Sequence, residues 1–268
     1  MEVSLKDLLE AGVHYGHQTS RWNPKMRSSI YGIRDGIHII DLQKTQKVLT
    51  QALGYIEDLV SKGGQVLFVG TKKAAQGFVE SEASRCGMFY IQNRWLGGTL
   101  TNLSTVRTSI KKLKQIEKMK EDGSIENLTK KEASQKEKQL EKLIKSIGGI
   151  KDMVGQPSVL FVVDAKKEQT AILEAHRLNI PVVAITDTNC DPEGIKYAIP
   201  GNDDSLSAVK LYTSLVADAC LSGKSKRQAD IVTDDGEQAV VEGSHIKVRR
   251  LKQKDSVEGN WNNDTSNA

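Results

Sequence analysis

The chain has 268 residues, and its 38 lysines and arginines exceed its 34 aspartates and glutamates, giving a formal net charge of +4. Three cysteines are too few for a disulfide framework and favour a reducing compartment, and no apolar run approaches the ~20 residues that span a membrane. The first residues also lack the pattern of a secretory signal. A disulfide scaffold, a collagen and a membrane channel are excluded, and we expect a weakly basic cytoplasmic protein.

The amino-terminal segment combines a short helix with a basic, irregular stretch. Ser4 as N-cap and a stripe of leucines predict a helix over residues 4–11. Residues 11–34 contain basic residues but no acid, and their glycine, asparagine and proline predict a loop or irregular extension. A short strand at 37–40 and a helix at 42–60 are expected next.

The middle of the chain alternates short apolar runs with helical patterns. Apolar runs of this kind, without polar alternation, are typical of strands that are buried on both faces of a parallel sheet. Right-handed crossovers then predict a doubly wound α/β sandwich. The predicted strands are 65–70, 88–91, 157–164, 181–186 and 197–199, and the predicted helices are 73–86, 167–178 and 205–222.

A long insertion interrupts this alternation. Apolar residues recur every three or four positions over 103–119 and again over 140–150, which places them on one stripe of each helix. Thr129 and Glu132 form a capping-box pattern at the start of the second helix. We expect an antiparallel helical hairpin, a coiled-coil arm over residues 103–150 that protrudes from the sandwich. Such an arm could also be a simple structural spacer.

These patterns divide the chain into three parts. Residues 1–102 and 151–223 are predicted to form the sandwich with its amino-terminal extension, and residues 103–150 the hairpin insertion. Residues 224–268 are poor in apolar side chains and are predicted to be a disordered basic tail. Within it, residues 245–254 carry five basic residues and no acid. This run is either a solvated charge run or a tether for a polyanion.

An enzyme is the alternative that a doubly wound sheet raises first. A nucleotide- or sugar-phosphate-binding enzyme would use Lys72 and the aspartates at the carboxyl ends of the strands. The loop at residues 69–73, however, lacks the glycines that cradle a pyrophosphate. No nucleophile elbow is present, and the three cysteines have no fixed partner. The enzyme therefore remains the second hypothesis.

The strand ends could also hold one structural cation. His17, Asp187 and Asp203 are the candidate ligands for zinc or magnesium, and no cofactor is required. The spacing of His14 and His17 is by itself a weak signal. Each aspartate could equally be an N-cap or a turn acceptor.

Positive charge gathers in two stretches of this nearly neutral chain. Residues 11–34 contain no acid, and residues 84–120 carry eight basic residues against the single acid Glu117. Such patches suit phosphate backbones. Trp22 and Trp95, each beside an arginine in a loop, suit unstacked RNA bases, although core packing is the alternative for each ring. The RNA-binding candidates from charge and rings are Arg21, Trp22, Lys25, Arg27, Arg94, Trp95, Arg107, Lys111, Lys112 and Lys114.

Several of these residues lie in longer motifs. The segment LLEAGVHYGHQTSRWNPKM occupies residues 8–26, and NRWLGGTLTN occupies residues 93–102. Together the motifs resemble the bacterial small-subunit ribosomal protein S2 family, and the resemblance covers about residues 3–223 but not the tail. Further matching motifs occur in the same order at 68–73, 128–133, 148–153, 157–181, 185–192 and 199–204.

The resemblance implies a flavodoxin-like sandwich with a protruding helical hairpin, in a structural protein of the cytoplasmic ribosome. It implies a place on the solvent side of the small subunit, between head and body, where the amino-terminal extension faces ribosomal RNA. It further implies contacts with neighbouring small-subunit proteins and a docking surface for the large mRNA-binding ribosomal protein S1, with no membrane and no small-molecule substrate. A protein-interaction scaffold is compatible with this role. Members of the family are not known for catalysis, and some carry a cation near the strand ends. The residues that match the RNA-facing loops are Arg21, Trp22, Asn23, Lys25, Arg94, Trp95, Thr99 and Asn102.

Overall fold

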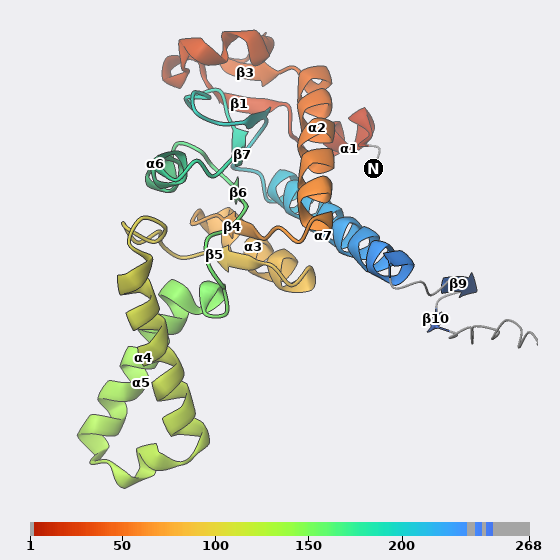
Figure 1. Cartoon of the computed structure of the whole chain (residues 1–268). Coiled ribbons are helices and arrows are strands. Elements are labelled where there is room, and N and C mark those ends of the chain that lie inside the picture. The colour runs from red at the N-terminus through yellow and green to blue at the C-terminus, as the bar shows by residue number, and fades with distance from the viewer. Residues whose placement is uncertain (1–2, 235–238, 243–244, 249–268) are drawn as a thin grey trace, which may run out of the picture. The chain divides into compact units, whose positions relative to one another are not determined.

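The computed structural model describes residues 3–234, 239–242 and 245–248. The chain forms two compact units, residues 1–227 and residues 228–268. The first unit contains two of the three sheets and all the candidate site residues (Figure 1).

A five-stranded parallel sheet lies in the first unit, with strand order β5-β4-β6-β7-β8. The chain passes from β4 to one edge and then returns to the other side of β4, which is the doubly wound arrangement. Every residue of β4, β6 and β7 is buried, as the continuous apolar runs of the sequence predict. The predicted α/β fold with a parallel sheet is therefore confirmed. The strands are β4 (Val66–Val69), β5 (Phe89–Ile91), β6 (Val159–Val162), β7 (Val182–Thr186) and β8 (Tyr197–Pro200).

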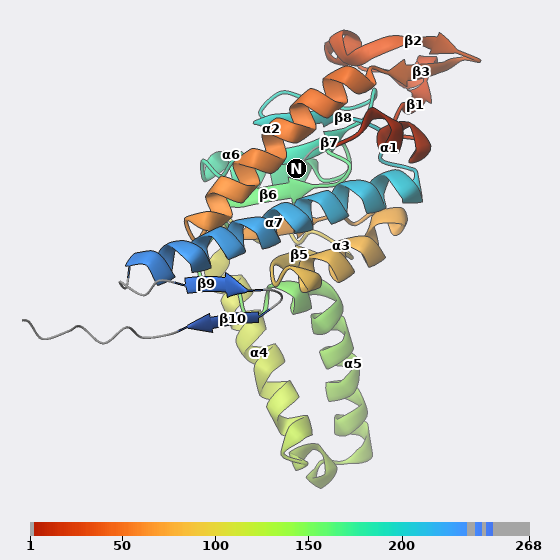
Figure 2. The ribbon, with the colours of Figure 1, turned by 90° about the vertical axis from the view of Figure 1, so that its right-hand side faces the viewer.

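Alternate strand residues supply the two faces of this sheet with separate cores. Val66 and Phe68 point into one core, whereas Leu67 and Val69 point into the other. Residues of α2, α3 and α7 cover the first core, and residues of α6 cover the second (Figures 1 and 2). These helices are α2 (Leu42–Ser61), α3 (Lys73–Arg85), α6 (Gln169–Arg177) and α7 (Leu206–Asp234).

Two long helices occupy the insertion between β5 and β6. They run side by side and pack against each other, and the second begins with the capping box of Thr129 and Glu132 that the sequence predicts (Figure 2). Ile147, the last residue of the second helix, and Ile150 just after it are buried in the second core, so the helices are continuous with the body of the unit at that end. The elements are α4 (Leu103–Glu121), η3 (Ser124–Asn127), α5 (Lys130–Ile147) and η4 (Gly148–Ile150).

The amino-terminal extension is more ordered than the sequence predicts. Residues 11–34 were expected to be irregular, but they contain two strands of a three-stranded antiparallel sheet, β1-β3-β2. Asp35 and Gly36 join β2 to β3 with φ values of 51° and 75°. Two residues with positive φ are what a tight hairpin turn of type I′ requires, and Asp-Gly is its usual sequence. The elements are α1 (Leu5–Glu10), β1 (Tyr15–Gln18), η1 (Thr19–Arg21), η2 (Pro24–Ser29), β2 (Ile30–Arg34) and β3 (Ile37–Ile40).

The carboxyl-terminal helix is longer than expected. It continues past Ser222, where the predicted helix ends, to Asp234. Strand β9 (Ala239–Glu242) then pairs antiparallel with β10 (His245–Val248). The remainder of the basic run, residues 249–254, lies outside the described residues. Among the described helices, none combines the length and the apolar character needed to cross a membrane.

Candidate nucleic-acid interface

The first basic loop is held against the carboxyl end of β7. The side chain of Asn23 caps η2 by accepting a hydrogen bond from the backbone N–H of Lys25 at 3.0 Å. The backbone N–H of Asn23 donates to the carbonyl of Thr188 at 2.8 Å. Arg21 and Arg27 on either side are exposed. The loop therefore has a fixed backbone and presents free guanidinium groups.

Lys25 differs from its arginine neighbours because its ammonium group is already paired. Its Nζ lies 2.7 Å from Oδ2 of Asp191 and also contacts the carboxylate of Glu193. Hydrogen bonds to these two carboxylates raise the pKa of Lys25. Sequence reasoning counted Lys25 as a phosphate ligand, but in the structure it ties the amino-terminal extension to the loop after β7.

The double-glycine loop is organised by one buried carboxylate. Glu174 of α6 accepts hydrogen bonds from the Trp95 indole N–H at 3.0 Å and from the backbone N–H groups of Gly98, Leu100 and Thr101 at 2.8, 3.0 and 3.2 Å. Burial by itself raises the pKa of Glu174, but these hydrogen bonds outweigh it and the net pKa is lowered. Sequence reasoning missed Glu174, because nothing local to α6 shows that a loop from another part of the chain lies over it.

Two of the predicted RNA contacts in this loop are buried. Trp95 is only 8 % exposed and packs in the second core, so its ring faces are not open to a base. Thr99 is also buried, and its hydroxyl donates to the carbonyl of Leu96 at 2.5 Å. Arg94 and Asn102 remain exposed at the two ends of the loop. The structure thus favours core packing for the ring of Trp95.

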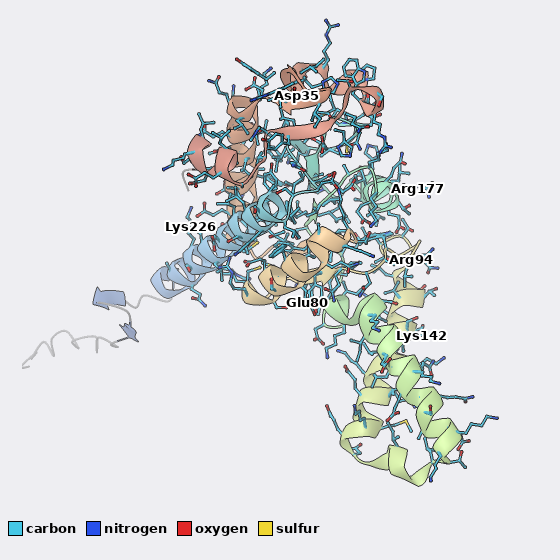
Figure 3. All side chains as sticks on the ribbon, turned by 180° about the vertical axis from the view of Figure 1, so that it is seen from behind. Asp35, Glu80, Arg94, Lys142, Arg177 and Lys226 are labelled. Atoms are coloured by element: carbon cyan, nitrogen blue, oxygen red, sulfur yellow. The ribbon has the colours of Figure 1, made fainter. Side chains whose placement is uncertain are left out.

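Further exposed cations follow on α4 and α6. Arg107, Lys111 and Lys112 are exposed on α4, whereas Lys114 lies 2.8 Å from the carboxylate of Asp152. Arg177, at the end of α6, projects from the same side of the molecule as Arg94 (Figure 3). Sequence reasoning missed it because no basic run surrounds it. Within the described part of the chain, ion pairs are absent from Arg21, Arg27, Arg94, Arg107, Lys111, Lys112 and Arg177.

An acidic cluster lies beside the first loop, at the carboxyl ends of the parallel strands. The structure brings together the three candidate ligands His17, Asp187 and Asp203, and adds Asp204; their ligand atoms lie within 4.8 Å of one another. His17 Nδ1 is 2.8 Å from Oδ2 of Asp187, and this hydrogen bond raises the pKa of His17. Burial, with help from neighbouring carboxylates, raises the pKa of Asp203 to about 7.

Lys72 lies within the same cluster. Its Nζ is 2.7 Å from Asp203, 2.5 Å from Asp204 and 3.6 Å from Asp164. One ammonium group therefore faces several carboxylates, so the net charge around the strand ends is negative. A phosphate would be repelled here, whereas a divalent cation would be attracted.

The donor set fits a hard or borderline cation. Carboxylate oxygens with one imidazole nitrogen suit magnesium or zinc. A second group of side chains, Asp164 with Cys190, shares Asp203 with the first. The hydroxyl of the fully buried Tyr212 has no hydrogen-bond partner among the residues that the structure describes, and its pKa is raised by burial and then by the charges of Asp187 and Asp203. His14 takes no part in this cluster and lies elsewhere.

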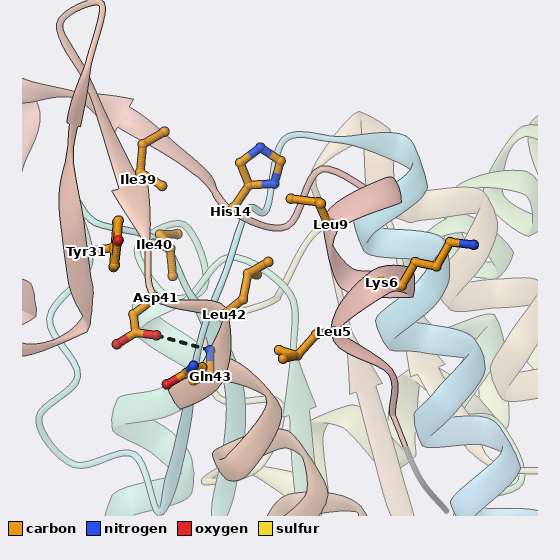
Figure 4. Close-up of a pocket in the computed structure, with 10 residues that line it drawn as sticks. All are labelled: Leu5, Lys6, Leu9, His14, Tyr31, Ile39, Ile40, Asp41, Leu42 and Gln43. Carbon is orange, nitrogen blue, oxygen red and sulfur yellow. Dashed lines mark hydrogen bonds between the residues drawn. The ribbon is translucent and has the colours of Figure 1, made fainter.

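His14 lines an apolar groove between α1 and the β2–β3 hairpin. Of the leucines of α1, Leu8 is buried, but Leu9 is 55 % exposed and faces the groove. Tyr31 on β2 is 81 % exposed and lines the opposite wall (Figure 4). The groove encloses about 500 Å³. Burial lowers the pKa of His14, which favours its neutral form at this apolar wall.

Comparison with known proteins places these motifs in one family. The family model described as ribosomal protein S2 matches residues 8–223. The small ribosomal subunit protein uS2 of Geotalea uraniireducens (strain Rf4) is 56 % identical over 232 residues, which cover 87 % of this chain and 91 % of that protein. The protein of the same name from Maridesulfovibrio salexigens is 54 % identical over 228 residues, covering 85 % of this chain and 88 % of that protein.

Proposed function

The chain belongs to the ribosomal protein S2 family, and from this premise we propose that it binds small-subunit ribosomal RNA through the exposed cations of its extension, its double-glycine loop and α4. As a member of the family it is a structural protein of the small ribosomal subunit and not an enzyme. It therefore works in the cytoplasmic ribosome, among ribosomal RNA and other ribosomal proteins, in translation.

The main support for this proposal is that several basic side chains are exposed and form no ion pair with the described residues. Arg21, Arg27, Arg94 and Arg107 come from three segments, yet all are exposed without an ion pair among the described residues. Such side chains can neutralise RNA phosphates and release the cations condensed on them, and that release supplies a large share of the affinity for a nucleic acid. Lys25 contributes less directly, because two carboxylates already hold it.

The pair of helices α4 and α5 acts, in this proposal, as a protruding arm beside the RNA. It is anchored in the second core by Ile147 at the end of α5 and by Ile150 of η4, and the exposed Lys111 and Lys112 add positive charge along α4. An extension and an arm that both carry cations suit a protein placed where two RNA masses meet. This supports the position between head and body of the small subunit.

The apolar groove is the proposed docking surface for the mRNA-binding ribosomal protein S1. Leu9, Tyr31 and the other apolar side chains of its walls are exposed together, rather than scattered singly (Figure 4). Exposed apolar surface of this kind marks a protein contact more often than an RNA contact. In a retention assay, Leu9→Ser with Tyr31→Ser should lower the amount of S1 held by small subunits. Leu173→Ser, equally exposed on α6, is the matched control and should leave S1 unchanged.

The acidic cluster holds, in this proposal, a structural cation. The ligands would be His17, Asp187, Asp203 and Asp204. The nearby hydroxyl of Tyr212, which has no partner among the described residues, would accept a hydrogen bond from a water bound to the ion. Such an ion would fix the amino-terminal extension, through His17, to the ends of β7 and β8. It would hold the extension in place and take no part in a reaction.

The second hypothesis, a nucleotide- or sugar-phosphate-binding enzyme, loses its chemical basis here. Lys72 was its phosphate ligand, but this ammonium group is held by Asp164, Asp203 and Asp204. The net negative charge of the cluster disfavours a phosphate at the strand ends.

Co-sedimentation with small subunits tests the proposed function. The tagged full chain should sediment with small subunits lacking their own copy, and high salt should reduce this binding. Replacing Arg21, Arg27 and Arg94 by glutamine should release the protein at a lower salt concentration. An equal charge loss on the other side of the sheet is the matched control, made by changing Lys47, Lys62 and Lys210, all exposed, to glutamine. Equal behaviour of the two triple variants would refute the interface.

A further inference from the structure

A second hollow, of about 630 Å³, lies between the η1–η2 segment and the β2–β3 hairpin. It combines an aromatic ring, a cation and two further polar side chains: Trp22, Arg27, Thr19 and His38 line it together with Ile33. No role in the fold accounts for this combination, because the cores of the unit lie elsewhere.

Among the residues that line this hollow, His38 is unusual because its side chain is buried and polar. The residue is only 5 % exposed, and both nitrogens of its imidazole are buried with no hydrogen-bond partner in the described part of the chain. Buried polar atoms normally have partners, so two orphaned nitrogens on one ring point to a group that is missing from the chain alone. A neutral imidazole offers one donor and one acceptor to such a group.

Trp22 and Arg27 supply the other two contacts that a nucleotide needs. The Trp22 ring lies 5.5 Å from the His38 ring, and the residue is 38 % exposed, so it is partly open to solvent. Arg27 is exposed, and among the described residues it forms no ion pair. A flat ring for stacking, an imidazole for a base edge and a guanidinium for a phosphate match the three parts of one nucleotide.

We propose that this hollow receives one unstacked base of the ribosomal RNA, which stacks on Trp22 and hydrogen-bonds to His38, while its phosphate meets Arg27. The inference rests on the proposed function, since it names the part of the RNA that one site takes. It also explains why the backbone of this loop is fixed at Asn23: a preorganised loop lowers the entropic cost of ordering a single nucleotide.

Ribosomal RNA binding by Trp22 variants tests the proposal. Trp22→Leu should lower affinity about tenfold at every salt concentration, because a stacked base contributes about that factor. The slope of affinity against salt should stay unchanged, since stacking releases no counterions. Trp22→Phe, which keeps a flat ring, should bind nearly as wild type, and so should Tyr15→Leu, an exposed aromatic outside this hollow. Far-ultraviolet circular dichroism verifies that each variant is folded.

Fluorescence gives an independent measurement with short single-stranded RNA. Stacking on Trp22 should quench tryptophan emission in the wild type, and Trp22→Phe should abolish that quench while retaining binding. Wild-type affinity of Trp22→Leu, or a quench unchanged in Trp22→Phe, would overturn the nucleotide site while leaving the proposed function intact. Failure of the wild type itself to bind ribosomal RNA would instead refute the proposed function, and this inference with it.

Discussion

The indole N–H of Trp95 donates a hydrogen bond to the carboxylate of Glu174 at 3.0 Å, across 79 residues of chain. The same carboxylate accepts three backbone N–H groups of the double-glycine loop. The conformation of this loop, and with it the position of Arg94, therefore depends on a side chain from a different βα unit.

Replacing Glu174 by glutamine should destabilise the fold. A glutamine amide presents donors where the loop also presents donors, so charged acceptor bonds are lost and buried N–H groups lose their partner. The free energy of unfolding should fall by about 2–3 kcal/mol. Urea unfolding followed by circular dichroism measures this, with Glu137→Gln on the exposed surface of α5 as the control. A loss as small as that of the control would show that water satisfies the loop equally well.

The stabilisation from Glu174 should disappear in acid. Because hydrogen bonding lowers its pKa in the folded state, its contribution is complete above the unfolded value of ~4.3. It is lost as the pH falls through the folded pKa, since protonation removes the charged acceptor. The difference in unfolding free energy between wild type and Glu174→Gln should thus shrink from pH 6 towards low pH. If this difference in unfolding free energy stayed constant down to low pH, the charge of Glu174 would not be what stabilises the loop.

Arg94 and Lys25 should respond differently to substitution, although sequence reasoning grouped them. Arg94→Gln should reduce the slope of log affinity against log salt by about 0.7–0.9, the value of one phosphate contact. Lys25→Gln should leave the slope nearly unchanged, because its ammonium group is paired with Asp191 and Glu193. Binding to ribosomal RNA at several salt concentrations measures both. Equal slopes for the two variants would mean that RNA opens the ion pairs of Lys25.

The acidic cluster should stabilise the fold when a divalent cation is supplied. Zinc or magnesium at about 100 times its dissociation constant should raise the unfolding free energy by about 2.7 kcal/mol, and a chelator should reverse this. His17→Gln should weaken the effect, while His176→Gln, exposed on α6, should not. Thermal unfolding with and without the ion provides the measurement. An identical response of the two variants would remove His17 from the ligand set.

Much of the local structure follows from the sequence alone. Apolar runs such as Val66–Val69 and Val159–Val162 predict buried strands because such a run can be covered only from both faces. The capping box of Thr129 and Glu132 likewise predicts the start of α5, since it satisfies its own helix end. The turn at Asp35 and Gly36 was equally available from the sequence, but the glycine, asparagine and proline of residues 11–34 favoured an irregular loop.

The availability of each side chain was decided by the tertiary structure. Sequence motifs place Trp22 and Trp95 in similar loops, yet the first is partly open and the second is buried on Glu174. Lys25 and Arg94 likewise look equivalent until Asp191 and Glu193 are brought to Lys25. Local propensity depends on neighbours a few residues away, whereas exposure and ion pairing depend on groups that only folding brings from distant parts of the chain. The sequence therefore determined which residues are chemically suited to RNA, and the packing of distant segments decided which of them are free to meet it.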